Sequence, residues 1–242
     1  IPIVVACHAR HEFKLTPEAL EEAIGPRTKW LILNNPNNPS GAVYTADELR
    51  LLARVLERHP HVWVLSDEIY EHYVYGTTVH VSFTTCATTL RQRTLTVNGV
   101  SKTYRMSGWR IGYAGGPSPL IDAIDTLMSQ STGGVCSISQ AAAVAALTGP
   151  QDCVSAIRQD FTRRRDLMIS RLAEIANFAC LPPNGTFYVF PDCKAYLDTV
   201  SPCGHDIATD HDLCAYLLET ANVAVVYGEA YGCPGHLRFS FA

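Results

Sequence analysis

The sequence predicts an α/β protein with a mostly parallel sheet, followed by a smaller α+β part. Short apolar runs at residues 3–7, 29–34, 62–66, 94–98 and 111–115 alternate with helical patterns. These runs are continuously apolar, which is typical of parallel strands covered by helices on both faces. The pattern changes after residues 147–150, where a long charged helix is followed by short strands. We therefore expect a large domain at residues 1–148 and a small domain at residues 149–242.

Helix start signals lie between the apolar runs of the large domain. Thr16 can cap a helix that has Pro17 at its first position. Thr45 and Glu48 have the spacing of a capping box, and apolar residues then recur at helical spacing. We expect helices at residues 17–24 and after Thr45, with two more at residues 119–128 and 138–147.

The small domain has its own order of elements. Residues 153–176 carry interspersed Arg and Asp and predict a long charged helix, on which Arg163, Arg164 and Arg165 form a solvated face. A strand is expected at residues 186–190 and a helix at residues 212–220. Two further strands are expected at residues 223–226 and 237–241.

Composition excludes several classes of protein. The 242 residues carry a net charge of −4, which gives no basic surface for nucleic acid. No apolar run reaches the roughly 18 residues of a membrane span, and the opening run is too short for a signal peptide. The nine cysteines include no Cys-x-x-Cys pair, which argues against a zinc ribbon or a disulfide scaffold. We expect a cytoplasmic protein with reduced thiols, and no membrane or nucleic-acid partner.

Polar residues follow three successive strands of the predicted sheet. Residues 35–41 read Asn-Pro-Asn-Asn-Pro-Ser-Gly and follow the second apolar run. Asp67 and Tyr70 follow the third run, and Lys102 follows the fourth. Ligands of open parallel sheets bind beyond the carboxyl ends of the strands. Each feature taken singly could be a turn or a cap, but their joint placement favours a site.

Lys102 is the residue with the most specific surroundings. It lies among small residues, and Arg110 follows eight positions later. An amine held in a polar crevice beside a second fixed cation is suited to act as a nucleophile toward carbonyl compounds. Two histidine patterns, at residues 8–11 and 205–211, could be drawn as metal ligands. A surface loop and a helix N-terminus explain them better, so we expect no metal site.

Five segments of the chain resemble the class I/II aminotransferases, which are pyridoxal-phosphate enzymes with the aspartate aminotransferase fold. Their order and spacing agree over essentially the whole chain. Residues 129–132 and 139–143 are most similar to bacterial aspartate or aspartate/prephenate aminotransferases. The family's N-terminal part, including its phosphate loop and its ring-stacking aromatic residue, and its C-terminal helix have no counterpart. The matching segments are residues 35–41, 66–70, 101–112, 183–191 and 235–240.

The resemblance implies roles for the residues at the strand ends. Lys102 matches the lysine that forms a Schiff base with the cofactor aldehyde and then carries the proton between substrate and cofactor. Asp67 matches the carboxylate that keeps the pyridine nitrogen protonated. Asn38 and Tyr70 match the donors to the ring oxygen O3′.

Phosphate and carboxylate binding are assigned by the same resemblance. Arg110, together with Ser101, matches the residues that hold the cofactor phosphate. Arg238 matches the arginine that binds the substrate α-carboxylate. Asn38 also matches a substrate-binding residue.

The resemblance implies an aminotransferase that uses pyridoxal 5′-phosphate. Its substrates would be an amino acid, with aspartate or a similar dicarboxylic acid as donor, and a 2-oxo acid in a ping-pong cycle. It also implies a homodimer. Two alternatives stay open: a C–S β-lyase of the same fold, and an incomplete fragment without catalysis.

Overall fold

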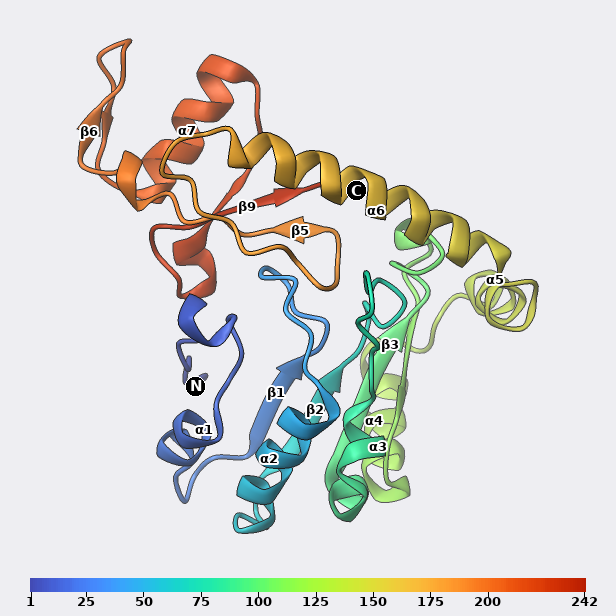
Figure 1. Ribbon diagram of the computed structural model, residues 1–242. Helices are drawn as coiled ribbons and strands as arrows, with labels where there is room; N and C mark the ends of the chain where they lie inside the picture. The colour runs from blue at the N-terminus through green and yellow to red at the C-terminus, as the bar shows by residue number, and fades with distance from the viewer. The chain divides into compact units, whose positions relative to one another are not determined.

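Four strands form one sheet in the order β1-β2-β3-β4 (Figure 1). In the computed structural model, which describes residues 1–242, β1, β2 and β3 are parallel and β4 is antiparallel to β3. Asn34 pairs with Asp67 at the ends of β1 and β2, so these strands end at one edge of the sheet. The predicted mostly parallel sheet is confirmed. The strands are β1 (Trp30–Asn34), β2 (Trp63–Asp67), β3 (Thr94–Gly99) and β4 (Gly112–Gly115).

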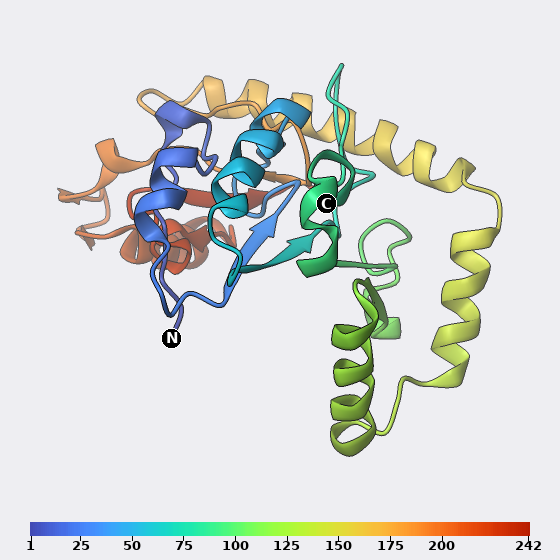
Figure 2. The ribbon, with the colours of Figure 1, turned by 90° about the horizontal axis from the view of Figure 1, so that it is seen from below.

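Helices cover this sheet unevenly. The capping box expected at Thr45 and Glu48 is confirmed at the start of α2, and Leu49, Leu52 and Leu56 behind it are fully buried. Each such burial stabilises the fold by about 1.5–3 kcal/mol. The helices α1 and α2 lie on one face of the sheet, and α4 lies on the other (Figure 2). The helices are α1 (Pro17–Ala23), α2 (Ala46–Glu57), α3 (Phe83–Cys86), α4 (Ser118–Ser131) and α5 (Ser137–Thr148), with 3-10 helices η2 (Thr88–Arg93) and η3 (Ser107–Trp109).

Two expectations for the apolar runs are wrong. Residues 3–7 form no strand: Ile3 and Val4 are each 72% exposed, because no neighbouring strand pairs with this backbone. The edge strands are also not covered on both faces. Ile32 of β1 is 71% exposed, and every residue of β4 is exposed. Apolar composition alone did not distinguish a central strand from an edge strand.

The remaining elements build small antiparallel sheets and two helices. β9 lies between β5 and β8, and β6 pairs with β7. Leu237 of β9 and Cys193 are fully buried in the core of this part. The strand expected at residues 223–226 begins only at Val226; the other expected elements are present. They are α6 (Asp152–Ala173), β5 (Tyr188–Val189), β6 (Thr199–Val200), β7 (Asp206–Ile207), α7 (Asp210–Ala221), β8 (Val226–Tyr227) and β9 (Leu237–Ser240), with 3-10 helices η1 (Ala9–His11), η4 (Lys194–Tyr196) and η5 (Gly228–Tyr231).

The chain consists of two compact units that are discontinuous in sequence. The sheet unit comprises Pro17–Pro36 and Val43–Arg158. The terminal unit comprises Ile1–Thr16, Asn37–Ala42 and Gln159–Ala242. The domain division near Gly149 stays a prediction. None of the helices combines the length and apolar character needed to cross a membrane.

Candidate functional site

The carboxyl edge of the four-stranded sheet brings three of the expected site residues together. Asp67 ends β2, and its carbonyl accepts hydrogen bonds from the Asn35 backbone at 2.9 Å and from the Asn34 amide at 3.2 Å. Its Oδ1 accepts from the Ile69 N–H at 3.2 Å, which closes a tight turn. The backbone of Asp67 is therefore held by the end of β1, and its side chain is held by the turn that follows β2.

The surroundings of Asp67 disfavour the ionised form of its carboxyl. Partial burial raises the pKa of its carboxyl, and the neighbouring Glu68 charge raises it further. The Ile69 N–H, the Asn34 side chain and the Lys102 ammonium act in the opposite direction without reversing the shift. A cationic ring nitrogen placed against this carboxyl would stabilise its charged form.

Lys102 lies in the turn directly after β3. Its Nζ is 5.9 Å from the centroid of the Tyr70 ring, and its charge acts on Asp67. The carbonyl of Lys102 accepts a hydrogen bond from the Tyr73 hydroxyl at 2.5 Å. Tyr73 is almost fully buried, and burial raises its pKa to about 12. Sequence reasoning missed Tyr73, because its bond to the Lys102 carbonyl joins turns that are 29 positions apart.

Glycine allows this edge of the sheet to close. A Cβ at Gly99, the last residue of β3, would lie 3.1 Å from Ile69 Cδ1 and 3.2 Å from the Cα of Gly112. Both distances are shorter than ordinary van der Waals contacts. The absence of a side chain at Gly99 therefore lets the turn that contains Lys102 pack against the turn that contains Asp67 and Tyr70.

The expected phosphate residues are less enclosed. Ser101 is half-buried in the turn beside Lys102. Arg110 is exposed and has a left-handed backbone conformation, with φ of 50°. Its guanidinium donates to the Ser107 carbonyl at 2.9 Å, so it is held within its own turn.

A second group of expected residues lies within the terminal unit. Arg238 of β9 donates from Nη1 to Asn38 Oδ1 at 3.1 Å. Its guanidinium carbon lies 4.5 Å from the Tyr188 ring centroid and 5.4 Å from that of Tyr231. The Nε of Arg238 is buried and has no hydrogen-bond partner. This donor set suits a carboxylate, which could accept the unused N–H.

The turn that contains Asn38 is held by close backbone packing. Gly41 has φ of +71°, and a Cβ there would lie 2.3 Å from Pro183 Cβ. The Gly41 carbonyl accepts hydrogen bonds from the backbone N–H groups of Asn184 at 3.0 Å and Gly185 at 2.8 Å. Two of the sequence segments singled out above are thus packed against each other. Sequence reasoning did not identify the aromatic residues Tyr188 and Tyr231 around Arg238.

Comparison with known proteins agrees with this geometry. The family model described as aminotransferase class I and II matches residues 2–242. The chain belongs to this family. It is 53% identical over 241 residues to an aspartate aminotransferase of Rhizobium meliloti, covering 100% of this chain and 59% of that protein. It is 50% identical over 244 residues to an aspartate/prephenate aminotransferase of Cereibacter sphaeroides, covering 100% of this chain and 60% of the relative.

Solved structures show the same fold. A crystal structure of the Rhizobium meliloti aspartate aminotransferase superposes with a TM-score of 0.95 at 52% identity, covering 99% of this chain and 60% of that one. The chain therefore spans about 60% of the length of the relatives it matches. The fold is that of the pyridoxal-phosphate-dependent transferases, as the sequence predicted.

The residues present fit the cofactor of this family. A half-buried carboxyl with a raised pKa suits a protonated ring nitrogen, and a nearby amine suits an aldehyde. The buried Tyr70 phenol adds a donor for a ring oxygen. All three lie within the sheet unit.

Proposed function

We propose that the chain carries the catalytic residues of a pyridoxal-phosphate-dependent aminotransferase. It would move the amino group of aspartate, or of a similar dicarboxylic amino acid, to a 2-oxo acid. The observation that carries this proposal is the grouping of Asp67, Tyr70 and Lys102 at one edge of the sheet. Family membership and two relatives named for aspartate support it.

In this proposal, residues of the sheet unit bind and orient the cofactor. Pyridoxal phosphate supplies an electron sink for the charge that develops at the substrate Cα. Asp67 holds a proton on the ring nitrogen through an ion pair, and Tyr70 donates to the ring oxygen. Ser101 and Arg110 bind the phosphate. Lys102 Nζ would hold the cofactor through its aldehyde, with loss of water, and would carry the proton between the substrate Cα and the cofactor.

Residues of the terminal unit select the substrate. The Arg238 guanidinium offers its unused Nε–H and a further N–H to the α-carboxylate. Asn38 holds the guanidinium through Nη1 and thereby fixes its plane. The family pattern also assigns the Asn38 amide to the cofactor oxygen and the substrate.

The proposal extends to location and assembly. We propose a cytoplasmic enzyme that acts as a homodimer, with small-molecule partners and neither nucleic acid nor membrane as a ligand. Its net charge of −4 supports the exclusion of polyanionic partners.

A single-turnover assay tests the proposed reaction. Protein loaded with pyridoxal phosphate is freed of excess cofactor and mixed with aspartate without an acceptor. The proposal predicts one equivalent of oxaloacetate per loaded site, and none from Lys102→Ala. The same preparation is given cysteine, from which a C–S β-lyase would release sulfide and pyruvate repeatedly without an acceptor. Repeated sulfide release with no oxaloacetate, or no product from either substrate, contradicts the aminotransferase assignment.

A further inference from the structure

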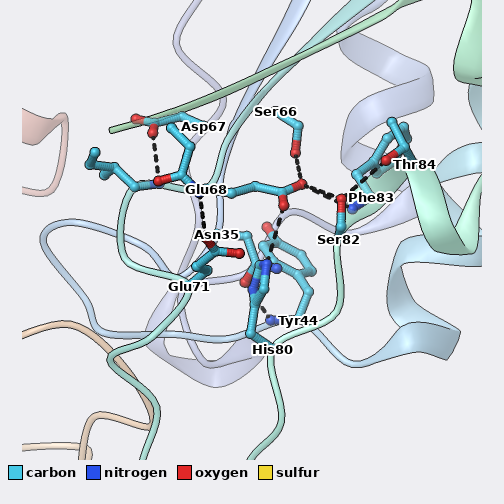
Figure 3. A network of polar contacts seen from close by, with 12 residues as sticks. Asn35, Tyr44, Ser66, Asp67, Glu68, Glu71, His80, Ser82, Phe83 and Thr84 are labelled. Atoms are coloured by element: carbon cyan, nitrogen blue, oxygen red, sulfur yellow. Dashed lines mark hydrogen bonds and ion pairs between the residues drawn. The ribbon is translucent and has the colours of Figure 1, made fainter. Parts of the chain in front are cut away.

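Glu68 is a buried carboxylate to which the proposed chemistry gives no role. Only 3% of the residue is exposed. Its Oε1 accepts hydrogen bonds from the Ser66 hydroxyl at 2.8 Å, the Ser82 hydroxyl at 2.9 Å and the Phe83 N–H at 3.1 Å. Its Oε2 lies 3.2 Å from His80 Nε2 (Figure 3). One side chain thus joins the end of β2 to the segment at residues 80–83.

Glu68 remains charged in this network. Burial by itself would raise the pKa of this carboxyl, but hydrogen bonds from His80, Ser66 and the Phe83 N–H hold it below the ordinary value. Hydrogen bonds to an ionised carboxylate are stronger than those between neutral groups. The carboxylate therefore holds its segment of backbone firmly.

The backbone of Glu68 is fixed as well. Its N–H donates to the Val97 carbonyl of β3 at 2.9 Å, and its carbonyl accepts from the Glu71 N–H at 2.9 Å. The first bond continues the parallel ladder one residue beyond Asp67. The second closes the turn that contains Tyr70. Asp67 therefore directly precedes the residue that is held, and Tyr70 lies within the turn that the Glu68 carbonyl closes.

Alternation along the strand links Glu68 to Asp67. Successive side chains of a strand point to opposite faces, so Ser66 and Glu68 share one face and Asp67 lies on the other. Figure 3 shows the Glu68 side chain extending away from Asp67 toward Ser66, Ser82 and His80. Fixing Glu68 on its face therefore fixes the direction in which Asp67 leaves the strand.

We propose that Glu68 is a positioning residue that holds Asp67 and Tyr70 in the orientation needed for cofactor binding. The inference rests on the proposed function. Glu68 acts through its neighbours and makes no contact with the cofactor itself. Its charge has a separate effect on Asp67, because it raises the pKa of that carboxyl. The two roles therefore predict opposite changes in cofactor affinity when the charge of Glu68 is removed. Loss of positioning weakens cofactor binding, whereas loss of the charge effect on Asp67 strengthens it.

The test compares Glu68→Gln with Glu71→Gln as a matched control. Both residues lie on the same turn, but the half-buried Glu71 carboxylate accepts instead from the Asn98 amide at 2.6 Å. Affinity for pyridoxal phosphate and the pH titration of the bound cofactor's visible absorbance are measured on the full chain, with urea unfolding of the cofactor-free protein. Because Glu68→Gln loses charged hydrogen bonds, we expect it to bind pyridoxal phosphate about tenfold more weakly. We also expect the pH midpoint of its absorbance to shift. Glu71→Gln should match the wild type in both.

Three results for the wild type or Glu68→Gln would overturn the proposal. Glu68 would have a purely structural role if Glu68→Gln bound pyridoxal phosphate within twofold of the wild-type affinity and its absorbance titrated at the same pH. This holds whatever the urea midpoint. Tighter cofactor binding would show that its charge matters and its position does not. If the wild type itself binds no pyridoxal phosphate, the proposed function fails and this inference fails with it. Should Glu68→Gln not fold, Ser82→Ala removes one donor and must weaken cofactor binding measurably; unchanged binding then contradicts the proposal.

Discussion

Arg238 donates a hydrogen bond to Asn38 over 3.1 Å, although the two residues are 200 positions apart in the sequence. Both belong to the terminal unit, because the turn at Asn37–Ala42 packs there. The bond uses Nη1 and leaves the buried Nε without a partner. An unused donor beside two aromatic rings would be unfavourable without a ligand, so this arrangement fits an anion-binding arginine.

The aromatic residues around Arg238 should set its affinity for carboxylate substrates. Replacing Tyr188 by Leu removes the ring 4.5 Å from the guanidinium and leaves an apolar side chain in its place. A cation–π contact is worth about 0.5–2 kcal/mol, so the KM for aspartate should rise about 2- to 30-fold with kcat less affected. Tyr188→Phe keeps the ring and should behave like wild type. Equal KM values for the Leu and Phe variants would refute this role.

Gly41 should be the least replaceable glycine of the Asn38 turn. Alanine there would have a left-handed backbone, which costs about 1–2 kcal/mol, and its Cβ would overlap Pro183. The free energy of unfolding should fall by more than about 3 kcal/mol in total. Gly76→Ala is the matched control, since Gly76 has φ of +61° with no atom near its Cβ. Equal losses in urea unfolding would show that the Pro183 contact is unimportant.

Asp67 should destabilise the cofactor-free protein at neutral pH. Its folded pKa is raised above 3.8, mainly by burial, so the folded chain holds this proton more tightly than the unfolded chain. Stability therefore declines as the pH rises from 3.8 through the folded pKa. Asp67→Asn should raise the urea midpoint at pH 7, and this gain should vanish at pH 3. With pyridoxal phosphate the order should reverse. A lower midpoint for the variant without cofactor at pH 7 contradicts the argument.

Local signals predicted the part of the site that depends on strand ends. Asp67 follows its apolar run directly and Lys102 lies four positions after the end of its run. Because parallel strands end at one edge of a sheet, the proximity of the two residues could be inferred. The cap at Thr45 was equally local. Asn38 was placed in its motif, but its bond to Arg238 depends on how a distant turn packs. No periodicity connects residues so far apart.

Other features depended on contacts that the sequence pattern does not contain. The run at residues 3–7 has strand composition, yet a strand forms only where a neighbour supplies its hydrogen bonds. No sequence pattern singled out Glu68, because its partners, Ser82 and His80, lie 12 to 14 positions later in a segment without regular pattern. Burial of a charge is decided by tertiary packing.

The central claim is that Lys102 is the amine that binds the cofactor, and peptide mapping after borohydride reduction tests it most directly. Protein mixed with pyridoxal phosphate is reduced, digested and analysed by mass spectrometry, with Lys102→Arg as the control. We predict one stoichiometric adduct, located on Lys102, together with a visible absorbance band that the variant lacks. An adduct on Lys14, Lys29 or Lys194 alone, or equal labelling of the Lys102→Arg variant, would contradict the claim.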